Sequence, residues 1–208
     1  MSVATTLTLH YRPSAGEGQA QAALAESWAF ETLVAQHEKR VYNLIFRSVG
    51  NHEDAADLTQ ETFIKAFRAY PRFRGQSQPY TWLCHIALNT CRDWFRKRTR
   101  QAKYHAFSLD SRAESEEVAQ YLLALSDDSD PVAEFERGQL AAEVHAALQA
   151  LPEALRTVVI LRDLQQLSYE EIVQATQLSL GTVKSRLHQG RLRLRRILLP
   201  KLSKEAAQ

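Results

Sequence analysis

The sequence predicts an all-α protein built from two small helical domains that a flexible linker joins. Apolar residues recur at steps of three, four or seven through most of the chain, which is the period of one face of an α-helix. No segment alternates apolar and polar residues for long enough to predict a β-strand. The helical period is lost over residues 103–130, where serine and acidic residues accumulate, so this segment is the expected linker.

The first domain is expected over residues 23–102. It follows a tail at 1–22 that mixes small and polar residues without a period, which is typical of a mobile chain end. Its first helix is expected to end at Gly50 and Asn51, because both residue types tolerate the left-handed conformation that closes a helix.

Two more helices complete this domain, over residues 53–70 and 80–98. Pro71 stops the first of them, whose core-facing residues are expected to be Leu58, Phe63, Ile64, Phe67 and Tyr70. The loop between them, at 72–79, has the composition of a turn, yet it contains Phe73 and two arginines. Spacings of four, three and four along the later helix predict a single polar stripe, made of His85, Asn89, Arg92 and Arg96.

The second domain is expected over residues 131–200, before a short tail at 201–208. Apolar residues at helical spacing mark its first helix, namely Phe135, Leu140, Val144, Leu148 and Leu151. Pro152 opens the next helix at a position where its missing N–H costs nothing. Ser168 and Glu171 then have the spacing of a capping box, which predicts a further helix start.

The last helix starts after Ser179 and carries two different faces. Its apolar face comprises Leu180, Val183, Leu187, Leu194, Ile197 and Leu198. Its opposite face is polar and basic near the start, with Lys184, Ser185, Arg186, His188 and Gln189. Two helices joined by a tight turn, the second of them cationic, predict a helix-turn-helix that places its second helix in the major groove of DNA. The alternative is a merely solvated arginine-rich helix, but such a helix would usually mix acids with its bases.

The formal net charge of +2 over 208 residues does not by itself indicate a nucleic-acid-binding protein. The charges are unevenly placed, however, because bases gather in 92–103 and 184–201 while acids dominate 110–136. Each basic segment could neutralise phosphates locally, so we expect binding to weaken as salt increases.

Several classes of function find no support. No apolar run approaches the roughly 20 residues that cross a bilayer, and the first residues lack the pattern of a secretion signal, so we expect a cytoplasmic protein. Cys84 and Cys91 fit packed thiols better than a disulfide; with His85 they could contact a metal, but the CxxC spacing of structural zinc sites is missing. We find no catalytic constellation and no phosphate-binding glycine loop, so we expect no enzyme, no metal and no cofactor.

Two long segments resemble the conserved blocks of bacterial extracytoplasmic-function sigma factors, which belong to the sigma-70 family. The first block includes DAADLTQETFIKAFRAYPRFRGQSQPYTWLCHIALNTCRDWFRKR, and the second includes LPEALRTVVILRDLQQLSYEEIVQATQLSLGTVKSRLHQGRLRLRR. The resemblance covers about residues 28–100 and 131–199, in the order of the family. It implies a subunit that binds RNA polymerase core and directs initiation at promoters, often in a stress response, without catalysis of its own.

The resemblance also implies a role for each candidate site. Asp57, Gln60 and Glu61 match the positions that meet the clamp helices of the largest polymerase subunit, where the alternative is a merely solvated helix face. The minus-10 element would be opened and held by Phe73, Tyr80, Trp82, Asn89, Arg92, Arg96 and Arg98, although an aromatic residue at a helix start, such as Trp82, is often only core. The minus-35 element would be read by Lys184, Ser185, Arg186, His188, Gln189 and Arg191.

The turn of the helix-turn-helix departs from many relatives, because Gln177 and Leu180 stand where a glycine or small polar residue and a proline are common. Expected partners are RNA polymerase core, through its clamp helices and flap, promoter DNA, and an anti-sigma factor. The acidic linker could follow the RNA exit path of the polymerase. The main alternative is an autonomous helix-turn-helix regulator, which would bind duplex DNA alone, usually as a dimer.

Overall fold

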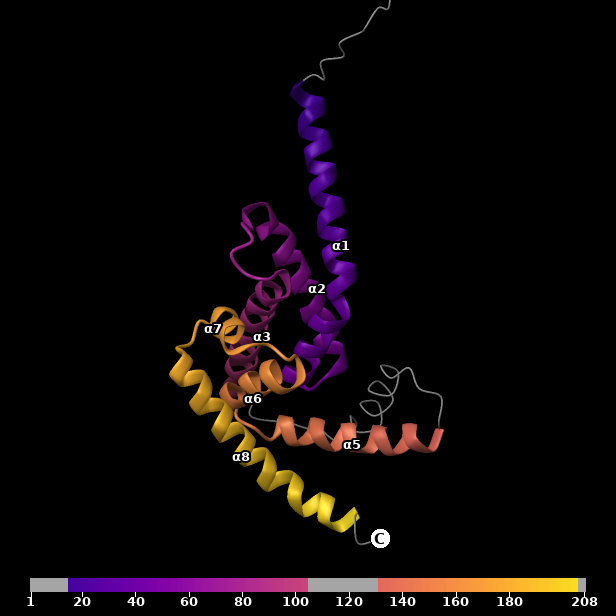
Figure 1. Cartoon of the computed structure of the whole chain (residues 1–208), viewed down its shortest axis with the longest axis vertical. Helices are drawn as coiled ribbons and strands as arrows, with labels where there is room; N and C mark the ends of the chain where they lie inside the picture. Colours follow the sequence, from indigo (N-terminus) through magenta and orange to yellow (C-terminus); the bar gives the residue numbers. More distant parts are fainter. Residues whose placement is uncertain (1–14, 105–130, 206–208) are drawn as a thin grey trace, which may run out of the picture. The chain divides into compact units, whose positions relative to one another are not determined.

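The computed structural model describes residues 15–104 and 131–205, with side chains over 29–101 and 140–200. Within these ranges the secondary structure is helical and contains no strand, as the sequence predicts (Figure 1). The chain divides after Gln36 into two compact units, and this division differs from the two domains that the sequence predicts. The second unit begins at His37, within the first helix, and contains all later helices. Residues 105–130, which include most of the expected linker, lie outside the described residues.

The N-terminal helices are α1 (Ala15–Val49), α2 (His52–Ala69) and α3 (Pro79–Tyr104), with a short 3₁₀ turn, η1 (Tyr70–Arg72), after α2. Gly50 ends α1 with a φ of +90°, so the expected left-handed cap is confirmed. The helix begins much earlier than expected, inside the predicted tail, because this stretch is rich in alanine, glutamine and glutamate, which favour helix.

The C-terminal helices are α5 (Pro131–Gln149), α6 (Glu153–Val159), α7 (Tyr169–Thr176) and α8 (Leu180–Glu205), with a π-helical turn, η2 (Ile160–Leu164), after α6. The last helix continues through Pro200 to Glu205, where a tail was expected. The predicted capping box of α7 is confirmed. Ser168 N–H donates to Glu171 Oε2 at 2.8 Å, and Glu171 N–H donates to Ser168 Oγ at 3.1 Å.

The cores follow the predicted apolar periods in most places. Among the N-terminal residues, the fully buried side chains include Val41, Leu44, Ile45, Phe46 and Leu83. Among the C-terminal residues they include Leu148, Val158, Val159, Ile160, Leu161, Ile172, Val183 and Leu187. These side chains remove apolar area from water, which is the main favourable term in folding.

Four predicted core residues are instead exposed. Ile64 and Phe67 on α2 are 51% and 54% exposed, Leu140 is 48% exposed and Leu180 is 42% exposed. On α2, Leu58 is buried as predicted, but the rest of the buried face is made of small residues, namely Ala55, Thr59, Thr62 and Ala66. Both threonines donate their hydroxyls to carbonyls one turn earlier, so they can be buried without losing a hydrogen bond.

The N-terminal and C-terminal helices of the second unit make direct contacts. Where α3 meets α7, His85 Nδ1 donates to the Ala175 carbonyl at 2.9 Å, and Thr81 Oγ1 donates to Glu171 Oε1 at 3.3 Å. At the end of α1, the Arg156 guanidinium donates to the Ser48 carbonyl. The structure therefore describes a closed form of the protein, in which the two sets of helices share an interface.

Gly190 permits the close approach of α8 to α6. A Cβ atom at this position would lie 2.6 Å from Val159 Cγ2 and 3.5 Å from the Leu155 carbonyl oxygen. We expect Gly190→Ala to lower the free energy of unfolding by about 1–3 kcal/mol, the usual cost of overpacking. Urea denaturation of the two proteins measures this difference.

The matched control for this prediction is Gly181→Ala on the same helix, since a Cβ there would meet nothing within 4 Å. Alanine is a better helix former than glycine, so this control should stabilise the protein slightly. Equal effects of the two substitutions would contradict the steric explanation.

Candidate functional site

The exposed face of α2 presents the acidic and amide side chains that the sequence singled out. Asp57, Gln60 and Glu61 are all exposed, and they share a face because helical positions three and four apart are neighbours. Asn51 fixes the start of this helix, since its side chain accepts a hydrogen bond from the Asp54 N–H at 2.9 Å. The structure therefore brings all three predicted side chains together on one accessible surface.

The same face also carries apolar side chains that sequence reasoning missed. Ile64 lies three positions beyond Glu61, and Phe67 lies seven positions beyond Gln60, so both are on the same face of the helix. Both side chains are more than half exposed. Glu61 pairs with Lys65 Nζ at 2.8 Å, so part of its charge is balanced within the helix. A partner helix could bury Ile64 and Phe67 while its basic residues pair with the carboxylates.

Three aromatic side chains meet where the loop after η1 joins α3. The Phe73 and Trp82 ring centroids are 4.8 Å apart, and those of Tyr70 and Trp82 are 6.4 Å apart. Phe73 N–H donates to the Tyr70 carbonyl at 2.9 Å, and Gly75 turns the loop with a φ of +68°. All three side chains are only half-buried, so a flat ligand such as a base could stack on them.

Tyr80 lies apart from this aromatic cluster. Its side chain is 7% exposed, its hydroxyl donates to Gln165 Oε1 at 2.6 Å, and the Arg40 guanidinium stacks 3.6 Å from its ring centroid. Burial raises the pKa of Tyr80 well above its ordinary value. In this closed form Tyr80 belongs to the contact with the C-terminal helices and is not accessible to DNA.

The predicted polar stripe of α3 is present, and its members are linked to each other. Because the Ala175 carbonyl can only accept, His85 Nδ1 carries the proton and His85 Nε2 accepts from Asn89 Nδ2 at 3.1 Å. Arg92 donates to Asn89 Oδ1 at 2.6 Å. The nitrogen and the oxygen of the Asn89 amide therefore each make one hydrogen bond in the closed form.

The two remaining arginines of the predicted minus-10 set, Arg96 and Arg98, behave differently. Arg96 is exposed and lies 3.6 Å from Asp93, a weak surface pair. Arg98 lies 3.7 Å from Asp54 Oδ2 of α2, and its guanidinium lies over the ring of Trp94 on its own helix, α3. Arg98 therefore lies away from the stripe with which the sequence grouped it.

Both cysteines are buried free thiols within the core of the N-terminal helices. Burial raises the pKa of Cys84 and of Cys91 to about 12, so both stay protonated and unreactive at neutral pH. Among the residues that the structure describes, no three histidine, cysteine or carboxylate side chains gather where a metal ion could be held.

The turn between α7 and α8 has the geometry of a helix-turn-helix. Gln177 adopts the left-handed conformation, with a φ of +60°, a conformation that glycine adopts more readily. A non-glycine residue there costs roughly 1–2 kcal/mol, part of which is offset because Gln177 Nε2 donates to the Gln174 carbonyl. Ser179 then caps α8, since its Oγ accepts from the Thr182 N–H at 3.2 Å.

The start of α8 presents the predicted DNA-reading side chains to solvent. Val183 and Leu187 face the core with 0% and 2% exposure. The side chains between them and after them are exposed or half-exposed, namely Lys184, Ser185, Arg186, His188 and Gln189. The amphipathic division of the helix therefore follows the predicted pattern from Val183 onward.

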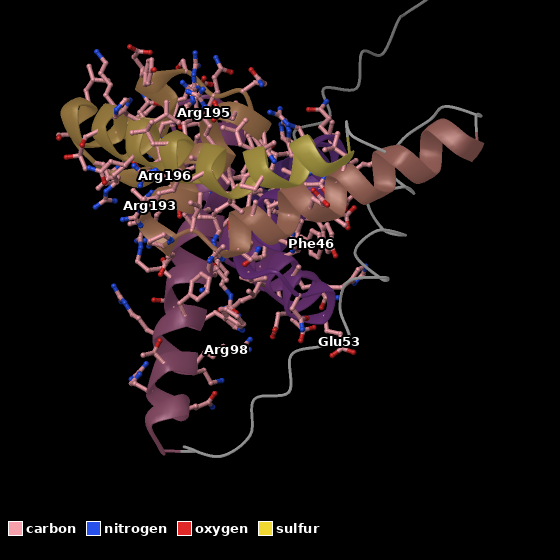
Figure 2. All side chains as sticks on the ribbon, turned by 90° about the horizontal axis from the view of Figure 1, so that it is seen from below. Phe46, Glu53, Arg98, Arg193, Arg195 and Arg196 are labelled. Atoms are coloured by element: carbon pink, nitrogen blue, oxygen red, sulfur yellow. The ribbon has the colours of Figure 1, made fainter. Side chains whose placement is uncertain are left out.

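Arg191 is held by an ion pair within the domain. Its guanidinium donates to both carboxylate oxygens of Asp163, which lies in η2, and this pairing raises the pKa of Arg191 above its ordinary value. Three exposed arginines follow along α8, namely Arg193, Arg195 and Arg196 (Figure 2). Among the described residues none of these three forms an ion pair, so they offer phosphate-binding charge directly.

Comparisons with known proteins show which family the chain resembles. Residues 33–101 match Sigma-70 region 2, and residues 141–194 match Sigma-70, region 4. The chain is 39% identical to the RNA polymerase sigma-H factor of Pseudomonas aeruginosa, over 84% of this chain and 88% of that protein. It is 41% identical to the ECF RNA polymerase sigma factor SigE of Mycolicibacterium smegmatis, over 88% of this chain and 65% of that protein.

Solved structures show the same fold. CnrH, solved in complex with the cytosolic domain of CnrY, superposes with a TM-score of 0.57 and 26% identity, over 86% of this chain and 93% of that chain. The sigma factor RpoE of Bartonella quintana, solved with the anti-sigma factor NepR, superposes with a TM-score of 0.65 and 23% identity, over 82% of this chain and 96% of that chain.

The helical fold and the two matched regions define a transcription initiation factor with sigma regions 2 and 4. The chain belongs to the extracytoplasmic-function sigma factors of the sigma-70 family. It therefore acts with RNA polymerase and directs transcription initiation at promoters, as the sequence predicts. Within the described residues, no helix is both long and apolar enough to cross a membrane.

Proposed function

We propose that α2 is the polymerase-docking helix of this sigma factor. Asp57, Gln60 and Glu61 would pair with basic side chains of the clamp helices, and Ile64 and Phe67 would pack between the partners. The single observation that supports this best is the exposure of both apolar side chains next to the carboxylates. Apolar side chains exposed together and rimmed by polar residues are typical of a protein–protein interaction site.

We propose that the aromatic cluster and the α3 stripe open and hold the minus-10 element. Phe73 and Trp82 would receive an unstacked base, and the Asn89 amide would read its edge once released from His85 and Arg92. Arg92 and Arg96 would hold the backbone of the strand. Tyr80 and Arg98 would take part only if their present contacts, with Gln165 and Asp54, were replaced.

We propose that α8 reads the minus-35 element. Lys184, Ser185 and Arg186 would contact base edges together with His188 and Gln189, which lie one turn further along. Arg191 would position the helix through Asp163, and the arginines after it would bind phosphates.

The proposed partners are RNA polymerase core, through its clamp helices and flap, promoter DNA and an anti-sigma factor that keeps the two domains away from DNA. We place the protein in the cytoplasm, where bacterial RNA polymerase acts. It would perform no chemistry itself, since the polymerase supplies the active centre.

Transcription by a reconstituted holoenzyme tests these assignments. Purified protein, core polymerase and a promoter library are combined, and the transcripts are sequenced to give the preferred minus-35 and minus-10 bases. Substitution of Arg186 or Gln189 should change the minus-35 preference alone, whereas substitution of Asn89 should change the minus-10 preference alone. An autonomous regulator would instead bind duplex DNA without polymerase and give no promoter-dependent transcript.

A further inference from the structure

A buried histidine lies where the region 4 helix α5 meets the end of α1. His145 is 5% exposed, and its ring stacks on Phe46 with the centroids 4.7 Å apart and the planes 17° from parallel. Neither ring nitrogen makes a hydrogen bond of normal geometry within the described residues. The ring therefore packs as an apolar group, and this environment favours neutral imidazole over the imidazolium ion.

Two cationic side chains act on this ring. Arg47 comes from α1 and Arg156 from α6, and both disfavour a positive charge on His145. Arg156 and Gln149 bind each other and the end of α1, since Arg156 donates to the Ser48 carbonyl and Gln149 Nε2 donates to the Arg47 carbonyl at 3.0 Å.

Other titratable groups surround this junction more loosely. His52, at the start of α2, contacts Phe46, the ring on which His145 stacks. The His52 and Phe46 ring centroids are 6.4 Å apart. Glu143 on α5 has one buried carboxylate oxygen, and Glu153 on α6 acts on Arg156. None of these carboxylates forms an ion pair with His145 among the described contacts.

The closed form cannot read both promoter elements at once. Arg92 of the minus-10 stripe and Arg186 of the minus-35 helix line the same groove, whose volume is about 350 Å³. The two promoter elements are named for positions −35 and −10, which are 25 base pairs apart. At about 3.4 Å per base pair this is roughly 85 Å of duplex. The domains must therefore separate before the protein can engage a promoter.

We propose that the junction between the two sigma domains is an acid-sensitive latch, in which neutral His145 stacked on Phe46 holds the closed form and protonation of His145 releases it. The consequence for DNA binding rests on the site assignments of the proposed function. The latch itself does not rest on those assignments, because its opening can be measured as a change in the distance between two helices.

The direction of the pH effect follows from the buried state of the ring. Burial, reinforced by Arg47 and Arg156, lowers the pKa of His145 from 6.5 to about 4 in the closed form, with the Gly50 backbone acting the other way. A solvated ring in the open form would return to its ordinary pKa. The latch is then fully stable above pH 6.5 and is lost as the pH falls towards 4, so opening should become about tenfold more favourable between pH 7.5 and 5.5.

Energy transfer between dyes on the full chain tests the latch. Dyes are attached at Glu38→Cys on α1 and Gln174→Cys on α7, which are both exposed, whereas the native cysteines are buried. Transfer should fall as the pH is lowered from 7.5 to 5.5 in the wild-type background. In His145→Gln, whose side chain neither stacks as a ring nor titrates, transfer should be the same at both pH values.

The control is a histidine substitution elsewhere in the contact, and the second measurement is the titration of the His145 ring itself. His85→Gln, at the other contact between the domains, should retain the pH dependence. The carbon-bound ring proton of His145, assigned by its loss in His145→Gln, should titrate in the wild-type chain with a midpoint well below 6.5. Transfer that does not change with pH, a pH response that survives in His145→Gln, or an ordinary midpoint would each overturn the latch.

The failure of the latch and the failure of the site assignments give different results. If the latch is wrong, the dye distance is insensitive to pH while Asn89 and Gln189 variants still alter promoter preference. If the assignments are wrong, the distance changes with pH but those variants transcribe the same promoters as the wild-type protein.

Discussion

The double variant Asp57→Lys/Glu61→Lys should lose binding to RNA polymerase core by about 100-fold or more. Each substitution turns an attraction to a basic partner into a repulsion, and removal of one member of a hydrogen-bonded charge pair at an interface commonly costs 2–5 kcal/mol. Both side chains are exposed, so the substitutions disturb no core packing. Fluorescence anisotropy of labelled protein titrated with core polymerase measures the change in Kd.

The control for this variant has the same change in net charge. Glu38→Lys/Asp93→Lys alters two exposed acids on α1 and α3, away from the α2 face. Glu61 also stabilises α2 through Lys65, so far-UV circular dichroism should verify that the helix content of both variants is unchanged. Equal weakening in the control would mean that the polymerase senses only the total charge of the protein.

The apolar part of the same surface gives an independent prediction. Ile64→Ser/Phe67→Ser should also weaken core binding, by about 10-fold or more, because it removes apolar area that the partner would cover. Folding stability should change little, since both side chains are already more than half exposed. A loss of stability without a loss of binding would show that these residues serve the fold of free α2.

The sequence predicts local structure well where one turn of helix contains the whole interaction. The Ser168–Glu171 capping box and the Gly50 helix end each involve residues close in sequence, and both are present. Periodicity alone did not choose the buried face of α2. Periodicity marks apolar side chains, but apart from Leu58 the buried face of α2 is made of alanines and hydrogen-bonded threonines. The apolar side chains Ile64 and Phe67 are instead more than half exposed.

Contacts between distant parts of the chain could not be predicted in this way. Tyr80 was grouped with the DNA-binding aromatics, but its partners are Arg40 and Gln165, and the latter is 85 positions away. Likewise Arg191 is paired with Asp163 and Arg98 with Asp54. No periodic pattern in one sequence specifies such pairs, because they depend on how helices pack after they have formed.

Asn89→Ala should lower the rate of promoter opening by about 10- to 100-fold while binding to core polymerase is retained. A side-chain amide that reads a base edge contributes about 1–3 kcal/mol of discrimination, and alanine removes both its donor and its acceptor. The substitution also frees His85 and Arg92 from their contacts with Asn89, so it should not strengthen the closed form. Permanganate footprinting of the melted minus-10 thymines measures opening directly.

A forked template then separates base reading from general effects on α3. Wild-type holoenzyme should bind a single-stranded minus-10 segment more weakly when the base that Asn89 contacts is replaced by an abasic site. Asn89→Ala should be insensitive to that replacement, because the interaction is already lost, whereas Thr99→Ala, at an exposed position of the same helix, should behave as wild type. Additive losses for Asn89→Ala and the abasic site would mean that the Asn89 amide does not contact the base.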